Sequence, residues 1–151
     1  MRRAFAAIAA MAISVAFARA GEVAPGDVKF EDMAIKAPLT GAAGSPDEGA
    51  KTLANRGLGN CLACHAVTAL AQEQFHGDVA PSLDGVADRW TVEELRAIVV
   101  DAKQVFSDET MMPGFYTLKL GINVRKDLAG KTILTAQQVE DVVAYLATLK
   151  E

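Results

Sequence analysis

The chain is poor in the residues that build disulfide frameworks and metal clusters. Its 151 residues include two cysteines, two histidines and one tryptophan. A zinc site needs four ligands at characteristic spacings, and the second histidine, His76, does not complete one with Cys61 and Cys64. A disulfide between these cysteines would close a very small loop and restrict the unfolded chain little. The scarcity of both residue types therefore argues against a zinc module and a disulfide scaffold.

Basic residues are also outnumbered. The 15 Lys and Arg face 19 Asp and Glu, which gives a formal net charge of −4. Removing residues 1–20 would take Arg2, Arg3 and Arg19 away and leave 12 basic residues against 19 acidic ones, a net charge of −7. Nucleic acids select clustered Lys and Arg that neutralise phosphates, so this balance argues against a nucleic-acid-binding protein. The length suits a single domain with one core.

The first twenty residues are typical of a secretory signal peptide. Arg2 and Arg3 precede an apolar run over residues 4–17, and Ala18 and Ala20 are small residues at the positions that a signal peptidase recognises. The apolar run is shorter than the ~20 residues that cross a bilayer. We therefore expect cleavage after Ala20, a mature chain without a membrane span, and a periplasmic location.

The sequence from Cys61 to His65, C-L-A-C-H, is the most informative pattern in the chain. C-x-x-C-H is the covalent attachment site of a c-type haem. On one helical turn, the two thiols lie on a shared face and can reach two haem vinyl groups, while the adjacent imidazole points to the iron. A redox dithiol is disfavoured by the adjacent His65 and by the lack of a β-α-β pattern. The motif predicts one haem c, held by Cys61 and Cys64, with His65 as proximal iron ligand.

The second axial ligand is expected from the segment 110–116, which contains Met111 and Met112. A residue before proline favours an extended backbone, which suits a loop laid across a haem face, so Met112 is preferred and Met111 is the alternative. His76 is discounted because it lies close to the proximal motif and precedes a glycine. Pro81 could accept a hydrogen bond from the His65 ring, which would fix its tautomer, or could be an ordinary turn proline.

Capping signals predict an all-α fold. Ser45 begins a helix that ends near Asn55, a helical turn carries the haem motif, and Thr91 and Thr135 begin two further amphipathic helices. Residues 21–44 are expected to form an extended arm, either partly mobile or partner-binding, and residues 45–151 the main domain. Alternating apolar residues at 116–124 favour an irregular loop with those side chains buried, with an edge strand or hairpin arm as the alternative. Trp90 could cover a haem edge or belong to the core.

Taken together, this layout resembles the class I cytochrome c family, whose first and last helices cross through a small-against-aromatic contact matched here by Gly49 and Tyr145. More narrowly, the chain resembles the SoxX family, the monohaem subunits of SoxAX cytochromes. The resemblance rests on three stretches, which are Pro38-Leu39-Thr40-Gly41 with Gly44-Ser45-Pro46, the segment 112–116, and the long run 128–146.

The SoxX resemblance implies a His/Met-ligated, low-spin haem and a heterodimer with SoxA, which carries its own haem and a modified cysteine. Such a complex is an L-cysteine S-thiosulfotransferase, which oxidatively joins thiosulfate to a cysteine of the carrier SoxYZ. The SoxX subunit accepts the electrons and passes them to a downstream soluble cytochrome c. No catalytic residue is expected in this chain, since no third cysteine exists. A free-standing cytochrome c shuttle and a haem enzyme with an open iron site, such as a peroxidase, remain alternatives.

Overall fold

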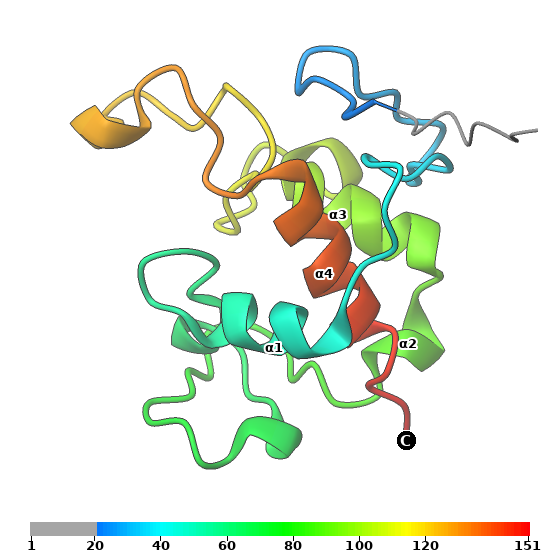
Figure 1. Ribbon diagram of the computed structural model, residues 1–151. Coiled ribbons are helices and arrows are strands. Elements are labelled where there is room, and N and C mark those ends of the chain that lie inside the picture. Colours follow the sequence, from blue (N-terminus) through cyan, green and yellow to red (C-terminus); the bar gives the residue numbers. More distant parts are fainter. Residues whose placement is uncertain (1–20) are drawn as a thin grey trace, which may run out of the picture.

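The computed structural model describes residues 21–151, and the expected signal peptide lies outside the described residues. Four α-helices and three short 3-10 turns are connected by long irregular segments (Figure 1). They are α1 (Pro46–Ala54), η1 (Cys61–Ala63), η2 (Thr68–Leu70), α2 (Val86–Arg89), α3 (Val92–Val105), η3 (Lys126–Leu128) and α4 (Ala136–Leu146). Over residues 21–151 the only β-type pairing is an isolated bridge between Glu31 and Ala34. The expected all-α fold is confirmed.

The three predicted helix starts are confirmed together with their capping residues. The Ser45 side chain accepts a hydrogen bond from the Glu48 N–H at the start of α1. Thr91 and Thr135 begin α3 and α4 with complete capping boxes, in which Glu94 and Gln138 bond back to the cap backbone. In the part of the chain that the structure describes, no helix is long and apolar enough to span a membrane.

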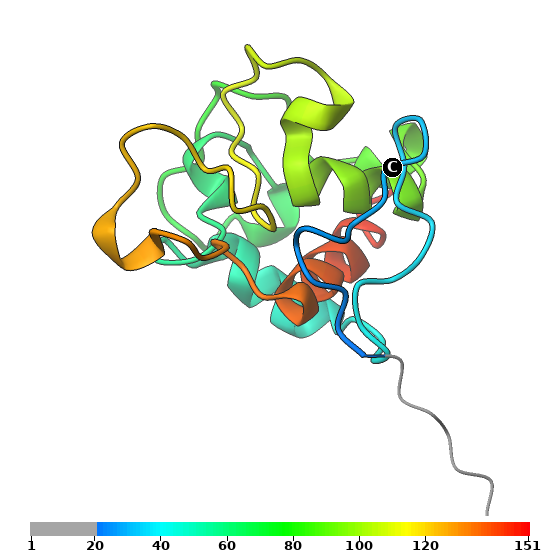
Figure 2. The same ribbon diagram turned by 90° about the horizontal axis from the view of Figure 1, so that it is seen from above.

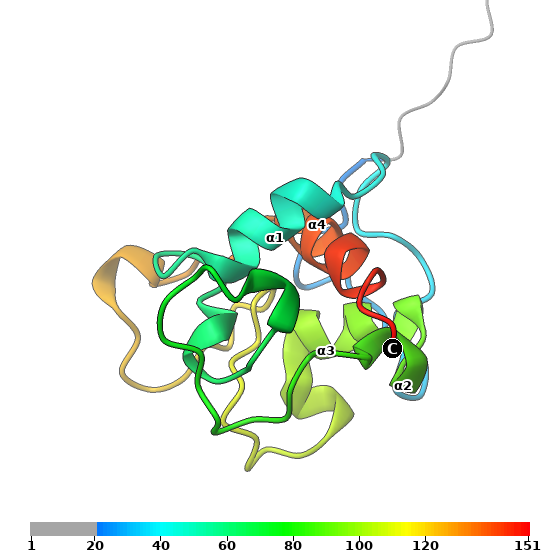
Figure 3. The same ribbon diagram turned by 90° about the horizontal axis from the view of Figure 1, so that it is seen from below.

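Helices α1 and α4 cross at close range and form the centre of the molecule (Figures 1 and 3). Gly49 is buried at the crossing, where an added Cβ would overlap the Asp141 carbonyl oxygen and lie 2.8 Å from the Tyr145 Cβ. Only glycine allows so close an approach of the two backbones. The α4 stripe of Val139, Val142 and Val143 is fully buried against α1 and α3.

The arm over residues 21–44 lies against the helices, although it forms no helix of its own. Ile35 and Leu39 are 3% and 1% exposed, so both side chains belong to the core. The Ile35 N–H donates to the Glu93 carbonyl at 3.0 Å, and the Val23 N–H donates to the Leu39 carbonyl at 2.8 Å. The arm therefore adds a layer of chain over α3 and α4.

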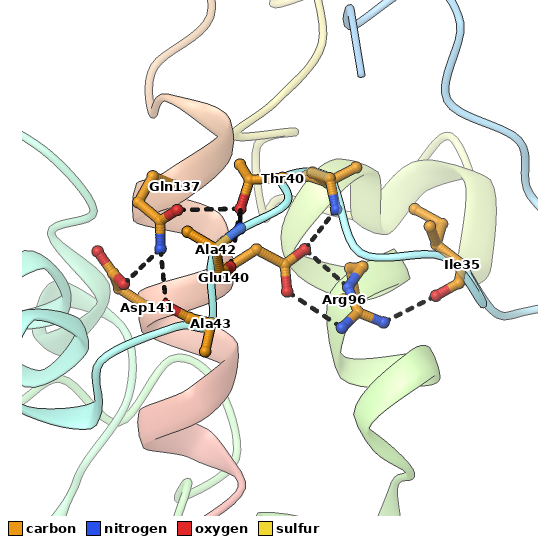
Figure 4. Close-up of polar contacts among 9 residues, drawn as sticks. Ile35, Thr40, Ala42, Ala43, Arg96, Gln137, Glu140 and Asp141 are labelled. Atoms are coloured by element: carbon orange, nitrogen blue, oxygen red, sulfur yellow. Dashed lines mark hydrogen bonds and ion pairs between the residues drawn. The ribbon is translucent and has the colours of Figure 1, made fainter. Parts of the chain in front are cut away.

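A buried ion pair joins this arm to both helices (Figure 4). Arg96 of α3 and Glu140 of α4 have side chains 6% exposed, and they form two hydrogen bonds of 2.8 and 3.1 Å. Arg96 also donates to the Ile35 carbonyl at 2.9 Å, and Glu140 accepts from the Leu39 N–H at 2.8 Å. The ion pair therefore forms hydrogen bonds with two backbone groups of the arm, one carbonyl and one N–H.

The segment between Tyr116 and α4 forms an irregular loop that projects from the body (Figure 2). Tyr116 is 2% exposed, whereas Leu118 is 55% and Ile122 100% exposed. The expected irregular loop is confirmed and the strand alternative is wrong, because no neighbouring segment offers it a backbone ladder. The expected burial of alternate side chains is wrong for Leu118 and Ile122, whereas Leu120 and Val124 are half-buried.

Candidate functional site

The haem motif forms a single tight turn. The N–H groups of Cys64 and His65 both donate to the Cys61 carbonyl, at 3.1 and 3.0 Å, which folds the five residues over the short helix η1. Neither cysteine is in a disulfide, and Cys61 is partly buried while Cys64 is exposed. The turn therefore brings two free thiols and one imidazole together.

The ionisation of Cys61 differs from that of the attacking cysteine in a redox dithiol. Burial raises the pKa of the Cys61 thiol to about 12. Reactive dithiols depend on a lowered thiol pKa that makes the thiolate available near neutral pH. Cys61 is instead a neutral thiol beside an apolar core, an environment that suits a thioether bond to an apolar macrocycle.

A loop over residues 77–83 packs on the motif and orients His65. The N–H groups of Gly77 and Ala80 donate to the carbonyls of Leu62 and Cys64, at 2.8 and 3.0 Å. A Cβ at Gly77 would overlap the Ala63 carbonyl oxygen, so glycine permits this contact. The loop places the Pro81 carbonyl 2.6 Å from His65 Nδ1.

The hydrogen bond to Pro81 assigns the His65 tautomer. A carbonyl oxygen only accepts, so Nδ1 must carry the proton and donate it. In the neutral imidazole Nε2 is then unprotonated and has a free lone pair, which is the form that binds a metal. This is the arrangement that a proximal haem ligand requires.

His76 is engaged within its own loop. Its Nδ1 accepts a hydrogen bond from the Val67 N–H at 3.2 Å, and its Nε2 lies 3.1 Å from the Leu70 carbonyl, to which it donates. Both ring nitrogens therefore stabilise the turn around η2. The geometry agrees with the sequence argument that set His76 aside as an axial ligand.

The two methionines of the distal segment differ in burial. Met112 is partly buried and packs against the main apolar cluster, as Cys61 does, whereas Met111 is 79% exposed. The chain on the N-terminal side of them is held by Lys103, whose Nζ donates to the carbonyls of Asp108 and Thr110, both at 2.6 Å. Met112 is thus the methionine that faces the protein interior.

On the C-terminal side, a break in α3 holds the segment. Asp101 has extended dihedral angles inside the helix (φ −158°, ψ 93°). Next to this break, the carbonyls of Val99 and Val100 accept hydrogen bonds from the N–H groups of Phe115 and Tyr116, at 3.2 and 3.1 Å. Lys103 and Asp101 carried no motif that could have identified them from the sequence, whereas Tyr116 begins the alternating apolar pattern that predicted its burial.

Trp90 packs as a core-edge residue between α2 and α3. Its ring makes a T-shaped contact with Phe106, with centroids 5.8 Å apart, and is partly buried against the main cluster. This contact accounts for the tryptophan by packing alone.

The residues present fit a covalently attached haem. They supply two unbonded thiols, an imidazole with a free Nε2, a half-buried thioether, and an apolar core on which Cys61 and Met112 both pack.

Comparison with known proteins identifies relatives of the chain. The family model for cytochrome c matches residues 46–150. The crystal structure of SoxXA from P. pantotrophus contains a chain that is 46% identical, with a TM-score of 0.80. The alignment covers 87% of the present chain and 100% of that chain. No curated protein sequence matches.

Proposed function

The chain belongs to the cytochrome c family and is a SoxX-type electron-transfer cytochrome with one covalent haem c, and from this premise we propose that it works with a SoxA-type partner. The observation that carries the proposal is the 46% identity over the whole of a chain from a SoxXA structure. The chain has only the two cysteines of the haem motif, so a cysteine that bonds thiosulfate would lie on the partner.

Within such a complex, this chain would accept the electrons released when thiosulfate is coupled to a SoxYZ cysteine, and would deliver them to a downstream soluble cytochrome c. The bound haem would supply one-electron redox chemistry at its iron. Cys61 and Cys64 would hold it by thioether bonds. Thioether attachment of haem c takes place on the outer side of the bacterial inner membrane, which supports a periplasmic location after cleavage behind Ala20.

We assign the axial ligands to His65 and Met112. His65 is supported by the Pro81 hydrogen bond, which leaves Nε2 free, and Met112 by its partial burial on the same apolar cluster as Cys61. Thioether ligation raises the potential of a haem iron. Met112→Ala should therefore abolish the weak near-infrared band of sulfur ligation and lower the potential.

Met111→Ala is the matched control, because it removes the same side chain from an exposed position one residue away. It should leave the near-infrared band and the potential unchanged. The opposite pattern would move the assignment to Met111. A high-spin oxidised spectrum in the unmodified protein would instead favour an open iron site and contradict both assignments.

The surface that meets the partner is proposed to be the projecting loop over residues 117–125. Ile122 is 100% exposed and Leu118 55% exposed, and Lys119 lies between them in an otherwise acidic chain. Exposed apolar side chains rimmed by charge are typical of protein interfaces. The arm is a weaker candidate, because Ile35 and Leu39 are committed to the chain's own core.

The test is co-purification from cells grown on thiosulfate, with mass spectrometry of any stoichiometric partner. A tightly bound second cytochrome with its own reactive cysteine is expected, and Ile122→Asp should weaken the association. Val92→Asp is the matched control, since Val92 is a 40% exposed apolar residue at the start of α3, away from the haem motif and the projecting loop. Met33→Asp tests the arm in the same way. A monomer with intact sulfur ligation would indicate a free-standing electron shuttle.

A further inference from the structure

The segment that carries Met112 is tied to the beginning of the described chain. Tyr116, four residues after Met112, is 2% exposed, and its hydroxyl donates to the Val23 carbonyl at 2.7 Å. The Glu22 carboxylate oxygen lies 3.1 Å from the same hydroxyl and is a second acceptor. These groups are 93 residues apart in the sequence. Figure 2 shows the arm beside the segment that follows Met112.

The arm residue that accepts this hydrogen bond is itself anchored. The Val23 N–H donates to the Leu39 carbonyl at 2.8 Å, and the Leu39 N–H donates to the buried Glu140 carboxylate at 2.8 Å. Hydrogen bonds therefore run from α4 through the arm to Tyr116. The backbone at Val23, which accepts the Tyr116 hydrogen bond, is therefore fixed to the core.

Tyr116 is also well suited to act as the donor. Burial, followed by the nearby Glu22 carboxylate, raises the pKa of the Tyr116 hydroxyl to about 12, so the group stays protonated at neutral pH. Its backbone N–H is already bonded to the Val100 carbonyl. The residue is thus fixed to α3 by its backbone and to the arm by its side chain.

We propose that residues 22–23 of the arm are a latch on the loop that carries the sixth ligand, and that Tyr116 is the positioning residue through which the latch acts. The side-chain bond from Tyr116 to Val23 limits how far the segment after Met112 can swing away. Tyr116 follows Met112 by only four residues, so a movement of this segment away from the body that includes Tyr116 would break the bond to Val23. The inference rests on Met112 as the axial ligand.

The first test uses the full haem-loaded protein and imidazole as an added iron ligand. Imidazole displaces a methionine only when its loop opens, and the exchange is followed by loss of the near-infrared band. In Tyr116→Phe the rate of imidazole entry should rise about fivefold to tenfold, as the loss of about one net hydrogen bond predicts. A rate within twofold of the unmodified protein would overturn the latch.

Tyr145→Phe is the matched control. It also removes a buried tyrosine hydroxyl, but this hydroxyl has no hydrogen-bond partner among residues 21–151, so no bond between two protein groups is lost. Imidazole entry in this variant should stay at the unmodified rate. An equal acceleration in both variants would show that the effect follows from general loosening of the core, and the proposal would be wrong.

A double-mutant cycle tests the partner side of the same bond. Deletion of residues 21–23 removes both acceptors while Tyr116 stays intact, so it also serves if Tyr116→Phe does not fold. Adding Tyr116→Phe to the deletion should give no further acceleration, because the bond is already absent. Independent, multiplying effects would refute a direct latch.

Amide hydrogen exchange separates this proposal from the ligand assignment. The readout is the pair of amides after Met112 that are hydrogen-bonded, at Phe115 and at position 116, whose N–H groups donate to the Val99 and Val100 carbonyls. Their exchange should become faster in Tyr116→Phe and stay unchanged in Tyr145→Phe, whichever side chain binds the iron. If Met112→Ala keeps the near-infrared band, the ligand assignment fails, but the exchange result still decides whether the arm restrains the loop. Unchanged exchange in Tyr116→Phe would overturn the latch itself.

Discussion

The buried pair of Arg96 and Glu140 allows a quantitative prediction of stability. Arg96→Met keeps most of the length and apolar stem of the side chain but removes its charge and its three hydrogen bonds to Glu140 and the Ile35 carbonyl. The Glu140 carboxylate would then remain buried with the Leu39 N–H as its bonded donor. Removing one partner of a buried pair costs about 3 to 5 kcal/mol, whereas an exposed pair contributes roughly 0 to 1 kcal/mol.

Both side chains are buried, so the cost given for a buried ion pair applies here. Arg96→Met should therefore lower the free energy of unfolding, measured by guanidinium denaturation at pH 7 followed by circular dichroism, by about 3 kcal/mol or more. The arm should also become more sensitive to limited proteolysis, because the Ile35 carbonyl loses its bond to Arg96 and only the Ile35 N–H still bonds to α3. Exposed Lys51, paired with Glu48 on α1, supplies the control, and Lys51→Met should cost less than about 1 kcal/mol.

The double variant Arg96→Met with Glu140→Leu refines the test. Replacing both charges by apolar groups removes the uncompensated carboxylate, so the double variant should be more stable than Arg96→Met alone. A loss below about 1 kcal/mol in Arg96→Met, or additive losses in the double variant, would refute the view that these two helices and the arm are joined through a desolvated charge pair.

Three further predictions concern the helix crossing and the pH dependence of stability. Gly49→Val should destabilise the fold by about 3 kcal/mol or more in the same denaturation assay, since its side chain would meet the α4 backbone at Asp141, while Ala50→Val, partly buried one residue away, should cost less. The raised pKa of Tyr116 means that the folded state holds this proton more tightly, so stability should fall as the pH rises from about 10 towards 12, and this fall should be smaller in Tyr116→Phe. Hydrogen bonds from the Thr68 side chain, and secondly from its N–H, lower the pKa of Asp84. The contribution of Asp84 to the free energy of unfolding is therefore present above about pH 4 and is lost on acidification. In an Asp84→Asn variant the free energy of unfolding should decrease less steeply as the pH falls below about 4.

The helices and the haem motif could be predicted because their signals are local. The cap residues Ser45, Thr91 and Thr135 bond to groups three positions ahead, and the C-x-x-C-H spacing specifies its own turn. Periodicity also placed Val139 and Val142 on the buried face of α4. Such features need no knowledge of the rest of the chain.

The remaining features depend on contacts between distant segments. Arg96 lies in a charged stretch that suggests a solvated helix face, and only the position of Glu140 on α4 explains its burial. Tyr116 and Leu118 are equivalent in the alternating pattern, yet the arm and α3 cover the first and leave the second exposed. The break in α3 at Asp101 is not marked by a glycine or proline in the sequence. It is stabilised by the N–H groups of Phe115 and Tyr116, which bond to the carbonyls just before it.

The crossing of the first and last helices also has a consequence for the order in which the chain matures. Ser45 and Asp141, which bond across this crossing, are 96 residues apart, so a chain exported N-terminus first has no partner for α1 until its export is nearly complete. We therefore expect Cys61 and Cys64 to lie on an unpacked segment during that interval, open to the apparatus that attaches the haem. By this argument the topology delays closure of the core until after the thiols have been within reach.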